Sequence, residues 1–156
     1  GTARTLIQNK SHFIDSDIGI LIHGDNAMSD TIMQLVLSHN RRPKQSILTM
    51  LTFESKIPSQ CGVVVKDKSG IVVEFHEKVS SPPSSTANCA IYAFDPKLLY
   101  QHIEKSCPQC IDFSRDVLPT LVNQIYACET KGSFIDIGTP SRYKEASEIW
   151  CNHEQK

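Results

Sequence analysis

The amino-acid sequence predicts an α/β domain that carries its chemistry at the ends of buried strands. Strand-like apolar segments alternate along the chain with helix-like segments, which is the pattern of α/β folds. Two of the apolar strands run into an acidic residue, in residues 20–26 (Ile-Leu-Ile-His-Gly-Asp-Asn) and 134–140 (Phe-Ile-Asp-Ile-Gly-Thr-Pro). The length of 156 residues, with 40% hydrophobic and 21% charged side chains, suits one ordinary globular domain. Because α/β folds bind ligands where strands end, both acidic residues are candidate site residues.

The first part of the chain contains two predicted core strands and one helix. After an irregular start, residues 18–24 read as a buried strand. Residues 28–40 have helical spacing, with Ser29 or Asp30 as candidate N-caps. Residues 46–53 alternate and are rich in apolar and branched side chains, which predicts a second core strand.

The middle of the chain predicts a hairpin, a loop, a strand and a helix. Residues 62–75 read as a hairpin, because two Val-rich runs flank the polar turn Asp-Lys-Ser-Gly. Residues 79–86 contain four Ser and two Pro, so we expect a loop there. Residues 87–94 predict another strand, and Pro96 suits the first turn of a helix that runs to about residue 105.

The last third continues the alternation. A helix is expected from about residue 113 to 124, capped by Asp112 or Ser114 and kinked or shortened by Pro119. Short strands follow at 125–129 and 133–137, and a closing helix at 141–151. The sequence has no internal repeat or long linker. We therefore expect a single domain over residues 1–156.

Charge and hydropathy disfavour two classes of partner. The net charge is −1 and the sixteen Lys and Arg are scattered, so the chain lacks the basic stripe of a nucleic-acid binder. No apolar run approaches the roughly 20 residues that span a bilayer, and the amino end lacks the pattern of a signal peptide. We expect a cytoplasmic protein with no nucleic-acid or membrane partner.

The six cysteines are dispersed rather than arranged as a disulfide framework. Cys61, Cys89 and Cys128 lie among small and apolar residues, where a free cysteine behaves as a small buried hydrophobe. Cys107 and Cys110 have CxxC spacing, but a zinc site needs two further ligands and no second CxxC or His pair follows. Plain loop cysteines are the favoured interpretation of this pair, and redox chemistry is the alternative.

Asp25 and Asp136, the two strand-end carboxylates, predict a divalent cation site. Mg²⁺ is commonly held by one or two protein carboxylates, with substrate phosphates and water completing its octahedron. The arrangement therefore suggests phosphoryl or nucleotidyl transfer. For either residue alone the competing interpretation is a cap or turn role, which Asp often fills after a strand.

A succession of eight short motifs runs along nearly the whole chain. In chain order the motifs are Gly1-Thr2-Ala3, Gly24-Asp25-Asn26, Gly62-Val63-Val64, Phe75-His76-Glu77-Lys78, Ala87-Asn88, residues 91–96, residues 113–119 and residues 136–140. This succession resembles the sugar-phosphate nucleotidyltransferases, and most closely their mannose-1-phosphate and heptose-phosphate guanylyltransferase branch. Each tripeptide alone is weak evidence, but the family order over nearly the whole chain is specific. The resemblance implies a Rossmann-like nucleotide-diphospho-sugar transferase fold, three-layered around a mixed sheet.

The resemblance also implies a reaction. A sugar 1-phosphate oxygen attacks the α-phosphorus of a nucleoside triphosphate, expected to be GTP. The attack expels pyrophosphate from the triphosphate and forms a nucleotide-diphosphate sugar. Such chemistry depends on positioning and charge neutralisation. Asp25 and Asp136 match the family's metal-binding aspartates, so the implied cofactor is Mg²⁺ and both aspartates are implied catalytic residues.

Five further positions match substrate-binding residues of the family. Glu77 matches a carboxylate that binds sugar hydroxyls, and Lys78 matches a catalytic cation that neutralises the sugar phosphate. Gly62 matches a glycine that the sugar approaches closely, Asn88 a polar sugar contact, and Gly1 the glycine of a turn near the base and ribose. Without the resemblance, Glu77 and Lys78 would read as an exposed charged strand end and Gly62 as a bulge residue.

The resemblance covers the C-terminal two thirds of the family fold. The family's first strand and the Gly-rich loop that wraps the triphosphate have no counterpart in this sequence, so we expect an N-terminally truncated fold. Two hypotheses follow: an enzyme completed by a further segment or a partner, or a non-catalytic remnant that binds sugar phosphates or nucleotide sugars. An exposed sheet edge would favour a homo-oligomer. The sequence leaves open which base and which sugar are used.

Overall fold

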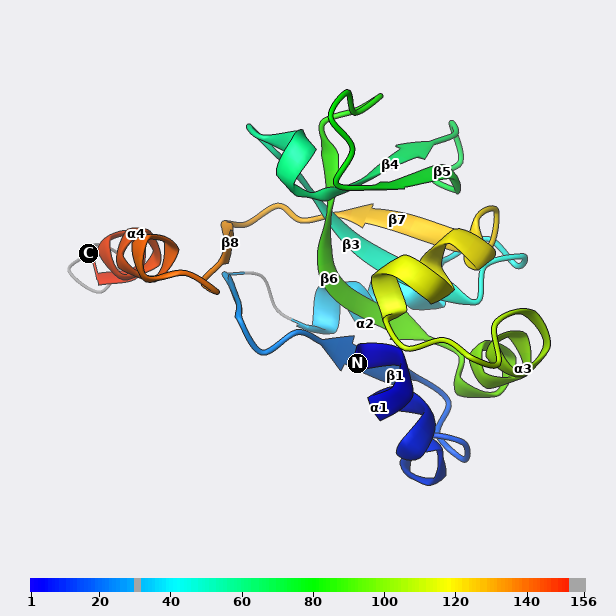
Figure 1. The fold of residues 1–156 in the computed structure, drawn as a ribbon. Helices are drawn as coiled ribbons and strands as arrows, with labels where there is room; N and C mark the ends of the chain where they lie inside the picture. The colour runs from blue at the N-terminus through cyan, green and yellow to red at the C-terminus, as the bar shows by residue number, and fades with distance from the viewer. Residues whose placement is uncertain (30–31, 152–156) are drawn as a thin grey trace.

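The computed structural model describes residues 1–29 and 32–151 and consists of a mixed sheet, a small ribbon and surrounding helices (Figure 1). The strands of the main sheet are β1 (Gly19–Ile22), β3 (Leu48–Glu54), β4 (Gly62–Lys66), β5 (Val72–Glu77), β6 (Thr86–Phe94) and β7 (Ile125–Glu129). The ribbon pairs β2 (Asn26–Met28) with β8 (Phe134–Asp136). The order in the sheet is β5-β4-β6-β3-β7, and β1 pairs with β6. Only β3 and β7 run parallel, so the expected mixed sheet is confirmed.

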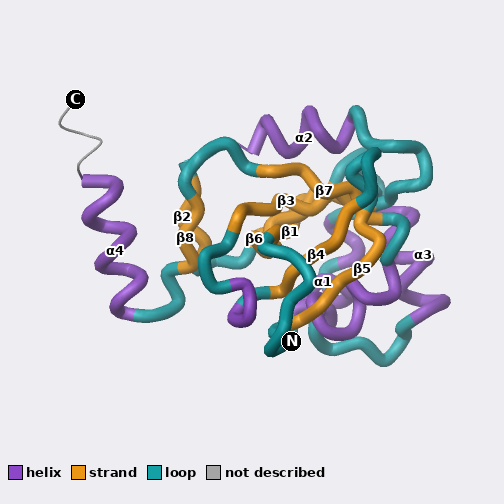
Figure 2. The backbone as a smooth tube through the Cα atoms, turned by 90° about the horizontal axis from the view of Figure 1, so that it is seen from above, coloured by secondary structure: helices purple, strands orange, loops and turns teal. Residues whose placement is uncertain are grey.

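The helices are short, and some of them cover the two faces of the main sheet. They are α1 (Thr2–Gln8), α2 (Ile32–Asn40), α3 (Pro96–Ser106), α4 (Pro140–Cys151), the 3₁₀ helices η1 (Lys10–His12), η2 (Pro58–Gln60) and η4 (Leu118–Leu121), and the π-helix η3 (Phe113–Val117). Figure 2 shows α2 on one side of the sheet and α3 on the other. Among the described residues, no helix combines the length and apolar character that crossing a membrane requires.

Alternation along β6 divides the core into two layers. Ile91 and Ala93 are buried with Leu35 of α2. Tyr92 and Phe94 point to the opposite face and are buried with residues of α1, α3, η3 and η4. Successive side chains of a strand face opposite sides of the sheet, so each face of β6 is covered by its own helices. This arrangement gives the three layers expected from the sequence.

The amino-terminal quarter differs from the prediction. The irregular start is wrong, because α1 forms there and buries Ala3 and Leu6, which lie three residues apart on one helix face. The helix expected from residue 28 begins only at Ile32, because residues 26–28 form β2. Ser29 bonds to Ser133 beside the ribbon instead of capping a helix, and Asp30 lies outside the described residues.

The helix expected over residues 113–124 is also wrong in part. A π-helical turn occupies Phe113–Val117 and a 3₁₀ turn follows to Leu121. Pro119 cannot donate a backbone hydrogen bond, so a regular α-helix does not continue through it. The predicted cap Asp112 is confirmed: its carboxylate accepts a hydrogen bond from the Arg115 backbone N–H at 3.0 Å.

The hairpin and α3 follow the sequence prediction closely. Strands β4 and β5 pair antiparallel around the turn at Asp67, whose carboxylate accepts backbone N–H bonds from Ser69 and Ile71. Helix α3 begins at Pro96, and Asp95 caps it by accepting from the Leu98 N–H at 3.0 Å. Polar turn residues and caps therefore fixed these boundaries.

A bulge in the middle of β6 was not predicted and is important for the site. Against β3, Met50 pairs with Tyr92 but Thr52 pairs with Asn88, so β6 contains extra residues at this point. Ala90 has a positive φ of 54°, and its N–H donates to the Asn88 side chain at 2.8 Å. The bulge re-aims the side chains of β6 next to the end of β1.

Candidate functional site

The ribbon of β2 and β8 brings the two strand-end aspartates together. Asp25 lies in the turn between β1 and β2, and Asp136 is the last residue of β8. Asn26 pairs with Asp136 across the ribbon, and the Ile137 N–H donates to the Asp25 carbonyl at 2.7 Å. Segments more than a hundred residues apart in sequence are thereby held in register. Both carboxylates are exposed to solvent.

Gly138 lies between the two carboxylates. A Cβ atom on Gly138 would be 3.0 Å from Asp136 Oδ1 and 3.2 Å from Asp25 Oδ2, so both oxygens point at one small volume. The Gly138 N–H also donates to Asp136 Oδ1 at 2.9 Å, which fixes the orientation of that carboxylate. The absent side chain leaves a space that two oxygen ligands face, and this geometry fits a small hard cation.

The donor set at this point fits a hard divalent cation such as Mg²⁺. Two carboxylates with open solvent around them leave the remaining octahedral positions to phosphate oxygens and water. Within residues 1–29 and 32–151, no group of three or more His, Cys, Asp or Glu is placed to hold a metal ion. Asp25 and Asp136 would therefore supply only two of the ligands of a bound Mg²⁺ ion, and a substrate and water would supply the others.

A second group of predicted residues meets at the end of the hairpin. Gly62 and Glu77 pair across β4 and β5, and a Cβ atom on Gly62 would lie only 2.6 Å from Glu77 Oε2. Because Gly62 has no side chain, the Glu77 carboxylate has room to lie beside it. Burial raises the pKa of Glu77, whereas the nearby positive charges of Lys78 and Arg115 lower it and Asp112 raises it.

Lys78 has an uncommon backbone conformation. Its φ is 52°, in the left-handed region that costs free energy for a residue with a side chain. The Lys78 N–H donates to the Cys61 carbonyl at 3.1 Å, which ties the end of β5 to the residue before Gly62. The bend sends the exposed Lys78 side chain out of the strand while Glu77 stays half-buried. Strain of this kind is typical of functional positions.

Asn88 and Tyr92 are joined by a hydrogen bond, and Tyr92 lies near enough to Glu77 to feel its charge. The Asn88 amide donates to the Tyr92 hydroxyl at 2.7 Å, and Ser114 also bonds to this hydroxyl. Tyr92 is fully buried, and burial raises the pKa of its hydroxyl far above the ordinary value, with the nearby Glu77 charge adding to the shift. The structure gives Asn88 a role in holding the bulge, and its contact with a sugar stays a prediction.

The bulge of β6 connects the two groups of residues. The Asn26 side chain donates to the Cys89 carbonyl at 2.6 Å, and the His23 N–H donates to the Ala90 carbonyl at 3.2 Å. The turn that carries Asp25 is thus bonded directly to the bulge that positions Asn88. The same bulge therefore lies next to both groups of residues.

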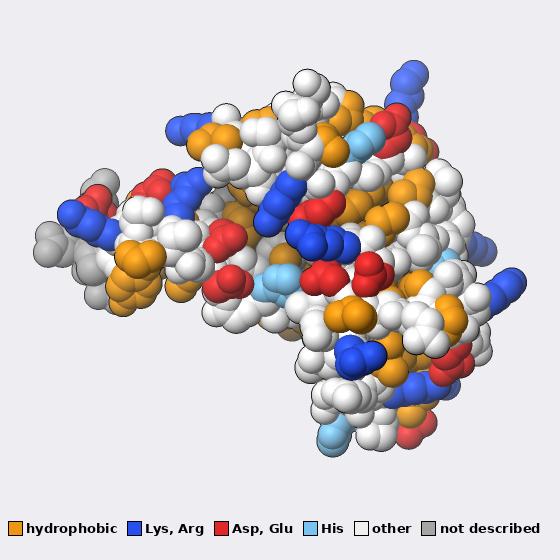
Figure 3. Space-filling model, in the orientation of Figure 1, with side chains coloured by type: hydrophobic (Ala, Val, Ile, Leu, Met, Phe, Trp, Pro, Cys, Tyr) orange, Lys and Arg blue, Asp and Glu red, His pale blue; other side chains and the backbone are white. Residues whose placement is uncertain are grey.

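Two clefts adjoin the aspartate pair. One, of about 870 Å³, lies between α1 and β1 and is lined by residues that include Gly1, Thr2 and Asp25. The other, of about 570 Å³, lies between the loop after β3 and the start of α4, and Lys56 and Asp136 are among its lining residues. Figure 3 shows acidic and basic side chains gathered in a band across the middle of this face. The predicted residue Gly1 thereby shares a cleft with Asp25.

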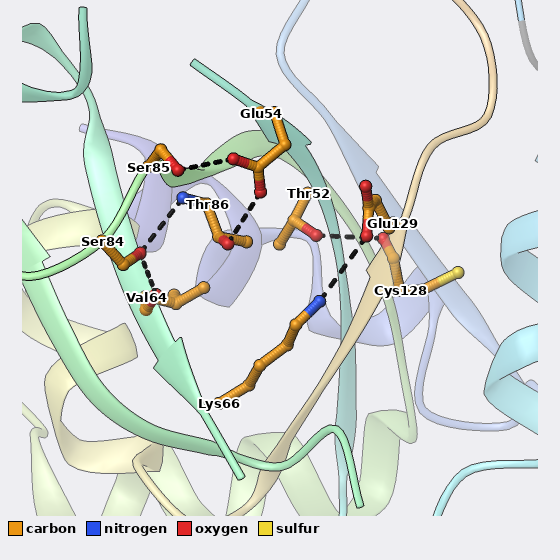
Figure 4. A network of polar contacts seen from close by, with 9 residues as sticks. All are labelled: Thr52, Glu54, Val64, Lys66, Ser84, Ser85, Thr86, Cys128 and Glu129. Carbon is orange, nitrogen blue, oxygen red and sulfur yellow. Dashed lines mark hydrogen bonds and ion pairs between the residues drawn. The ribbon is translucent and has the colours of Figure 1, made fainter. Parts of the chain in front are cut away.

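A polar network holds the loop beside the second cleft (Figure 4). The Glu54 carboxylate accepts hydrogen bonds from the Ser85 hydroxyl at 2.6 Å and the Thr86 hydroxyl at 3.0 Å, and these bonds lower the pKa of Glu54. Ser84 donates to the Val64 carbonyl at 2.6 Å. The end of the Ser- and Pro-rich loop is therefore anchored to β3 and β4 rather than free.

Sequence reasoning assigned no role to two residues that the structure places in the site. Gly138 stood within the quoted motif, but its position between the carboxylates depends on the ribbon. Arg115 lies on η3, and its charge acts on Glu77, which is far away in sequence. A glycine two residues after a strand-end Asp was the available signal for Gly138, whereas the quoted motif at residues 113–119 contains Arg115 but nothing in it points to Glu77.

We predict that Gly62→Ala weakens sugar-phosphate binding by displacing Glu77. The added Cβ would lie 2.6 Å from Glu77 Oε2 and 3.1 Å from the Phe75 ring, so the flexible carboxylate must move. Affinity for a sugar 1-phosphate, measured by calorimetry, should fall about as far as in Glu77→Ala. In a Glu77→Ala background, Gly62→Ala should then add little, and two independent losses that sum would show that Gly62 acts by another route.

The fold and the paired carboxylates define an α/β protein in which two carboxylate oxygens at strand ends face one small space. The model of the nucleotidyl transferase family matches residues 1–153, and the chain belongs to this family. It is 25% identical over 155 residues to glucose-1-phosphate adenylyltransferase of Pseudothermotoga lettingae, covering 94% of this chain and 37% of that protein. It is 28% identical over 142 residues to the enzyme of the same name from Thermomicrobium roseum, covering 88% and 33%. The chain thus spans about a third of the length of these curated relatives.

A solved structure has the same fold. A Bacillus anthracis structure, described as a glucose-1-phosphate thymidylyltransferase in complex with sucrose, superposes with a TM-score of 0.79. The match covers 96% of this chain and 60% of the other, at 24% sequence identity. This likeness confirms the predicted nucleotidyltransferase fold class. Family membership and fold agree with the sugar-phosphate nucleotidyltransferase assignment made from the motifs.

Proposed function

We propose that this chain forms the sugar-phosphate and metal-binding part of a sugar-1-phosphate nucleotidyltransferase. The observation that carries the proposal is the convergence of Asp25 Oδ2 and Asp136 Oδ1 on the space beside Gly138. In a chain of the nucleotidyl transferase family, such a carboxylate pair at strand ends supports Mg²⁺-assisted transfer between phosphates. Bound Mg²⁺ would supply neutralisation of the negative charge on phosphate oxygens.

The remaining site residues have complementary roles in this proposal. Glu77, held half-buried by Gly62 and raised in pKa by burial, accepts hydrogen bonds from sugar hydroxyls. Lys78 and Arg115 flank Glu77 with positive charge and hold the sugar phosphate, which fixes the attacking oxygen in line with the α-phosphorus. Asn88 keeps this surface in shape through the bulge. Positioning and charge therefore account for the catalysis that these residues would provide.

The proposal also concerns which sugar 1-phosphate and which nucleoside triphosphate are the substrates. The curated relatives are named for glucose 1-phosphate and adenylyl transfer, and the solved structure for glucose 1-phosphate and thymidylyl transfer. These names favour a hexose 1-phosphate with ATP or dTTP. The guanine and mannose preference expected from the motifs stays a prediction, and direct competition among ATP, dTTP and GTP decides between them.

The experiment is a calorimetric titration of the chain with ADP-glucose, dTDP-glucose and GDP-mannose, each with and without Mg²⁺. We expect saturable binding of at least one nucleotide sugar that requires Mg²⁺ and is lost in Asp136→Asn. Asp17→Asn, which changes an exposed aspartate far from the pair, is the matched control and should bind as the wild type does. Unchanged binding in Asp136→Asn, or binding indifferent to Mg²⁺, would contradict the metal assignment.

Turnover separates the enzyme from a binding module. Release of pyrophosphate from a nucleoside triphosphate and a sugar 1-phosphate, assayed with the chain alone and within a full-length family member carrying these residues, should depend on Asp136. Nucleotide-sugar binding without turnover in either setting would favour the binding module. Binding and turnover are measured separately, so a negative result for turnover does not weaken the evidence from binding, and the reverse also holds.

The open edge of β1 supports a proposal of self-association. Within the described residues β1 pairs only with β6, and Leu21 and Ile22 line the cleft beside α1, with Ile22 45% exposed. An uncovered strand edge with apolar neighbours favours pairing with another chain. Sedimentation at tens of micromolar should show a dimer or larger species, and Ile22→Lys should shift it toward the monomer. A wild-type monomer at that concentration would contradict this proposal.

A further inference from the structure

Two cysteines at the carboxyl end of α3 lie outside the proposed transferase machinery and form a local pair. Cys107 directly follows α3, and the Cys110 N–H donates to the Cys107 carbonyl at 3.0 Å. A turn closed by this bond brings the first and fourth Cα atoms within about 7 Å. Disulfides form across Cα separations of roughly 4.4 to 6.8 Å, so the backbone is already shaped to accept one.

The side chains of this pair meet at the margin of the core. Cys110 is 7% exposed and belongs to the core cluster, whereas Cys107 packs against that cluster and is partly exposed. Burial raises the pKa of Cys110 to about 11, and the Cys107 thiol contributes both by its charge and by a hydrogen bond. The two thiols are therefore neighbours, and Cys107 is the more accessible of the two to a reagent from solvent.

We propose that Cys107 and Cys110 are a reversible dithiol–disulfide site, oxidised by exchange with a low-molecular-weight disulfide of the glutathione class. The Cys107 thiolate attacks one sulfur of the oxidant, forming a mixed disulfide and releasing one thiolate. The Cys110 thiol then loses its proton and attacks the Cys107 sulfur, which releases the second thiolate and closes the intramolecular disulfide. Two cysteine thiols are oxidised and one external disulfide is reduced to two thiols, so atoms and electrons balance.

The position of the pair links it to the first cleft. The next residue, Ile111, accepts backbone hydrogen bonds from Ala3 and Arg4 through its carbonyl, at 3.1 and 3.3 Å. Asp112, one residue further, accepts from the Thr2 hydroxyl at 3.4 Å. A disulfide would close the turn immediately before the segment that anchors the start of α1. The proposal concerns covalent chemistry of the chain itself and does not rest on the transferase activity.

The test is thiol mapping of the whole reduced chain after incubation with excess glutathione disulfide. Remaining thiols are blocked with an alkylating reagent, and the protein is then digested and analysed by mass spectrometry. We expect the peptide that contains both cysteines to resist alkylation and to have lost two hydrogen atoms, and dithiothreitol to reverse this change. The rate of closure should rise with pH, because the buried Cys110 must lose its proton before it attacks.

Single substitutions give the expected order of events. Cys110→Ser should accumulate a glutathione adduct at Cys107, and Cys107→Ser should prevent closure and leave Cys110 largely unmodified. Cys61→Ser, which removes another partly exposed cysteine, should leave disulfide formation unchanged. A stable glutathione adduct at Cys107 in the wild type, or full alkylation of both cysteines after oxidation, would overturn the proposal without any need for the variants to fold.

Discussion

Gly138→Ala is expected to weaken Mg²⁺-dependent nucleotide-sugar binding strongly while leaving the fold intact. The new Cβ would lie 3.0 Å from Asp136 Oδ1 and 3.2 Å from Asp25 Oδ2, in the space that both oxygens face. It would exclude an ion from between the carboxylates or force them apart. We expect at least about a tenfold loss of affinity in calorimetry, equivalent to about 1.4 kcal/mol. Because Gly138 is exposed, the unfolding free energy should change by no more than about 0.5 kcal/mol.

Gly24→Ala is the matched control for this substitution. Gly24 is exposed and directly precedes Asp25, yet a Cβ built on it has nothing within 4 Å. Its affinity should therefore equal that of the wild type. Equal losses in the two variants would show that any substitution near the turn is damaging and that the space beside Gly138 has no special role.

The second large expected effect is a loss of unfolding free energy at acidic pH, which we attribute to the buried residue His39. Its side chain bonds to the Thr49 hydroxyl at 2.9 Å, and within the described part of the chain its Nε2 atom has no partner. Burial first, and then the charge of Arg42, lower the pKa of His39 to about 4, while Asp95 opposes the shift. The folded protein therefore keeps His39 neutral at pH values where the unfolded chain takes up a proton.

The difference between the folded and unfolded pKa of His39 makes the protein less stable as pH falls. The stabilisation is fully present above pH 6.5 and is lost as pH falls toward 4, because only the unfolded chain gains a proton in that window. At about 1.36 kcal/mol per pH unit, the loss from this residue reaches about 3 kcal/mol. Urea unfolding at pH 7 and pH 4.5 should show a smaller pH-dependent loss in His39→Gln than in the wild type.

A second histidine provides the control for the pH experiment. His12 is exposed on η1, so His12→Gln should keep the wild-type difference in unfolding free energy between the two pH values. Several carboxyl groups also titrate below pH 5, and they contribute equally to all three proteins. An identical pH dependence in the wild type and in His39→Gln would contradict the assignment of the effect to His39.

The sequence predicted the features that local pattern determines. Asp95 before Pro96 marks a helix start in any context, and the polar turn at residues 67–70 defines its hairpin. The two strand-end aspartates were predicted as a pair, because an acidic residue that follows an apolar strand is visible in the sequence. From the family motifs we expected Gly62, Glu77 and Lys78 to lie in one substrate-binding site. The structure does bring these three residues together.

The features that were missed depend on distant parts of the chain. Met28 was expected to begin a helix, yet residues 26–28 form β2 because β8 pairs with them. The bulge at Ala90 arises where β6 bonds to β3 on one side and to the end of β1 on the other. These pairings join residues that are far apart in the sequence, so local sequence patterns could not predict them. For the same reason the position of Gly138 and the nearness of Arg115 to Glu77 could not be predicted.

The central claim is that Asp25 and Asp136 hold the same ion, and a double-mutant cycle tests it most directly. Mg²⁺-dependent affinity for the bound nucleotide sugar would be measured for the wild type, Asp25→Asn, Asp136→Asn and the double variant. If one ion bridges both carboxylates, either substitution removes most of the effect and the double variant loses little more. Losses that add fully in the double variant would place the two aspartates in separate sites and contradict the shared metal.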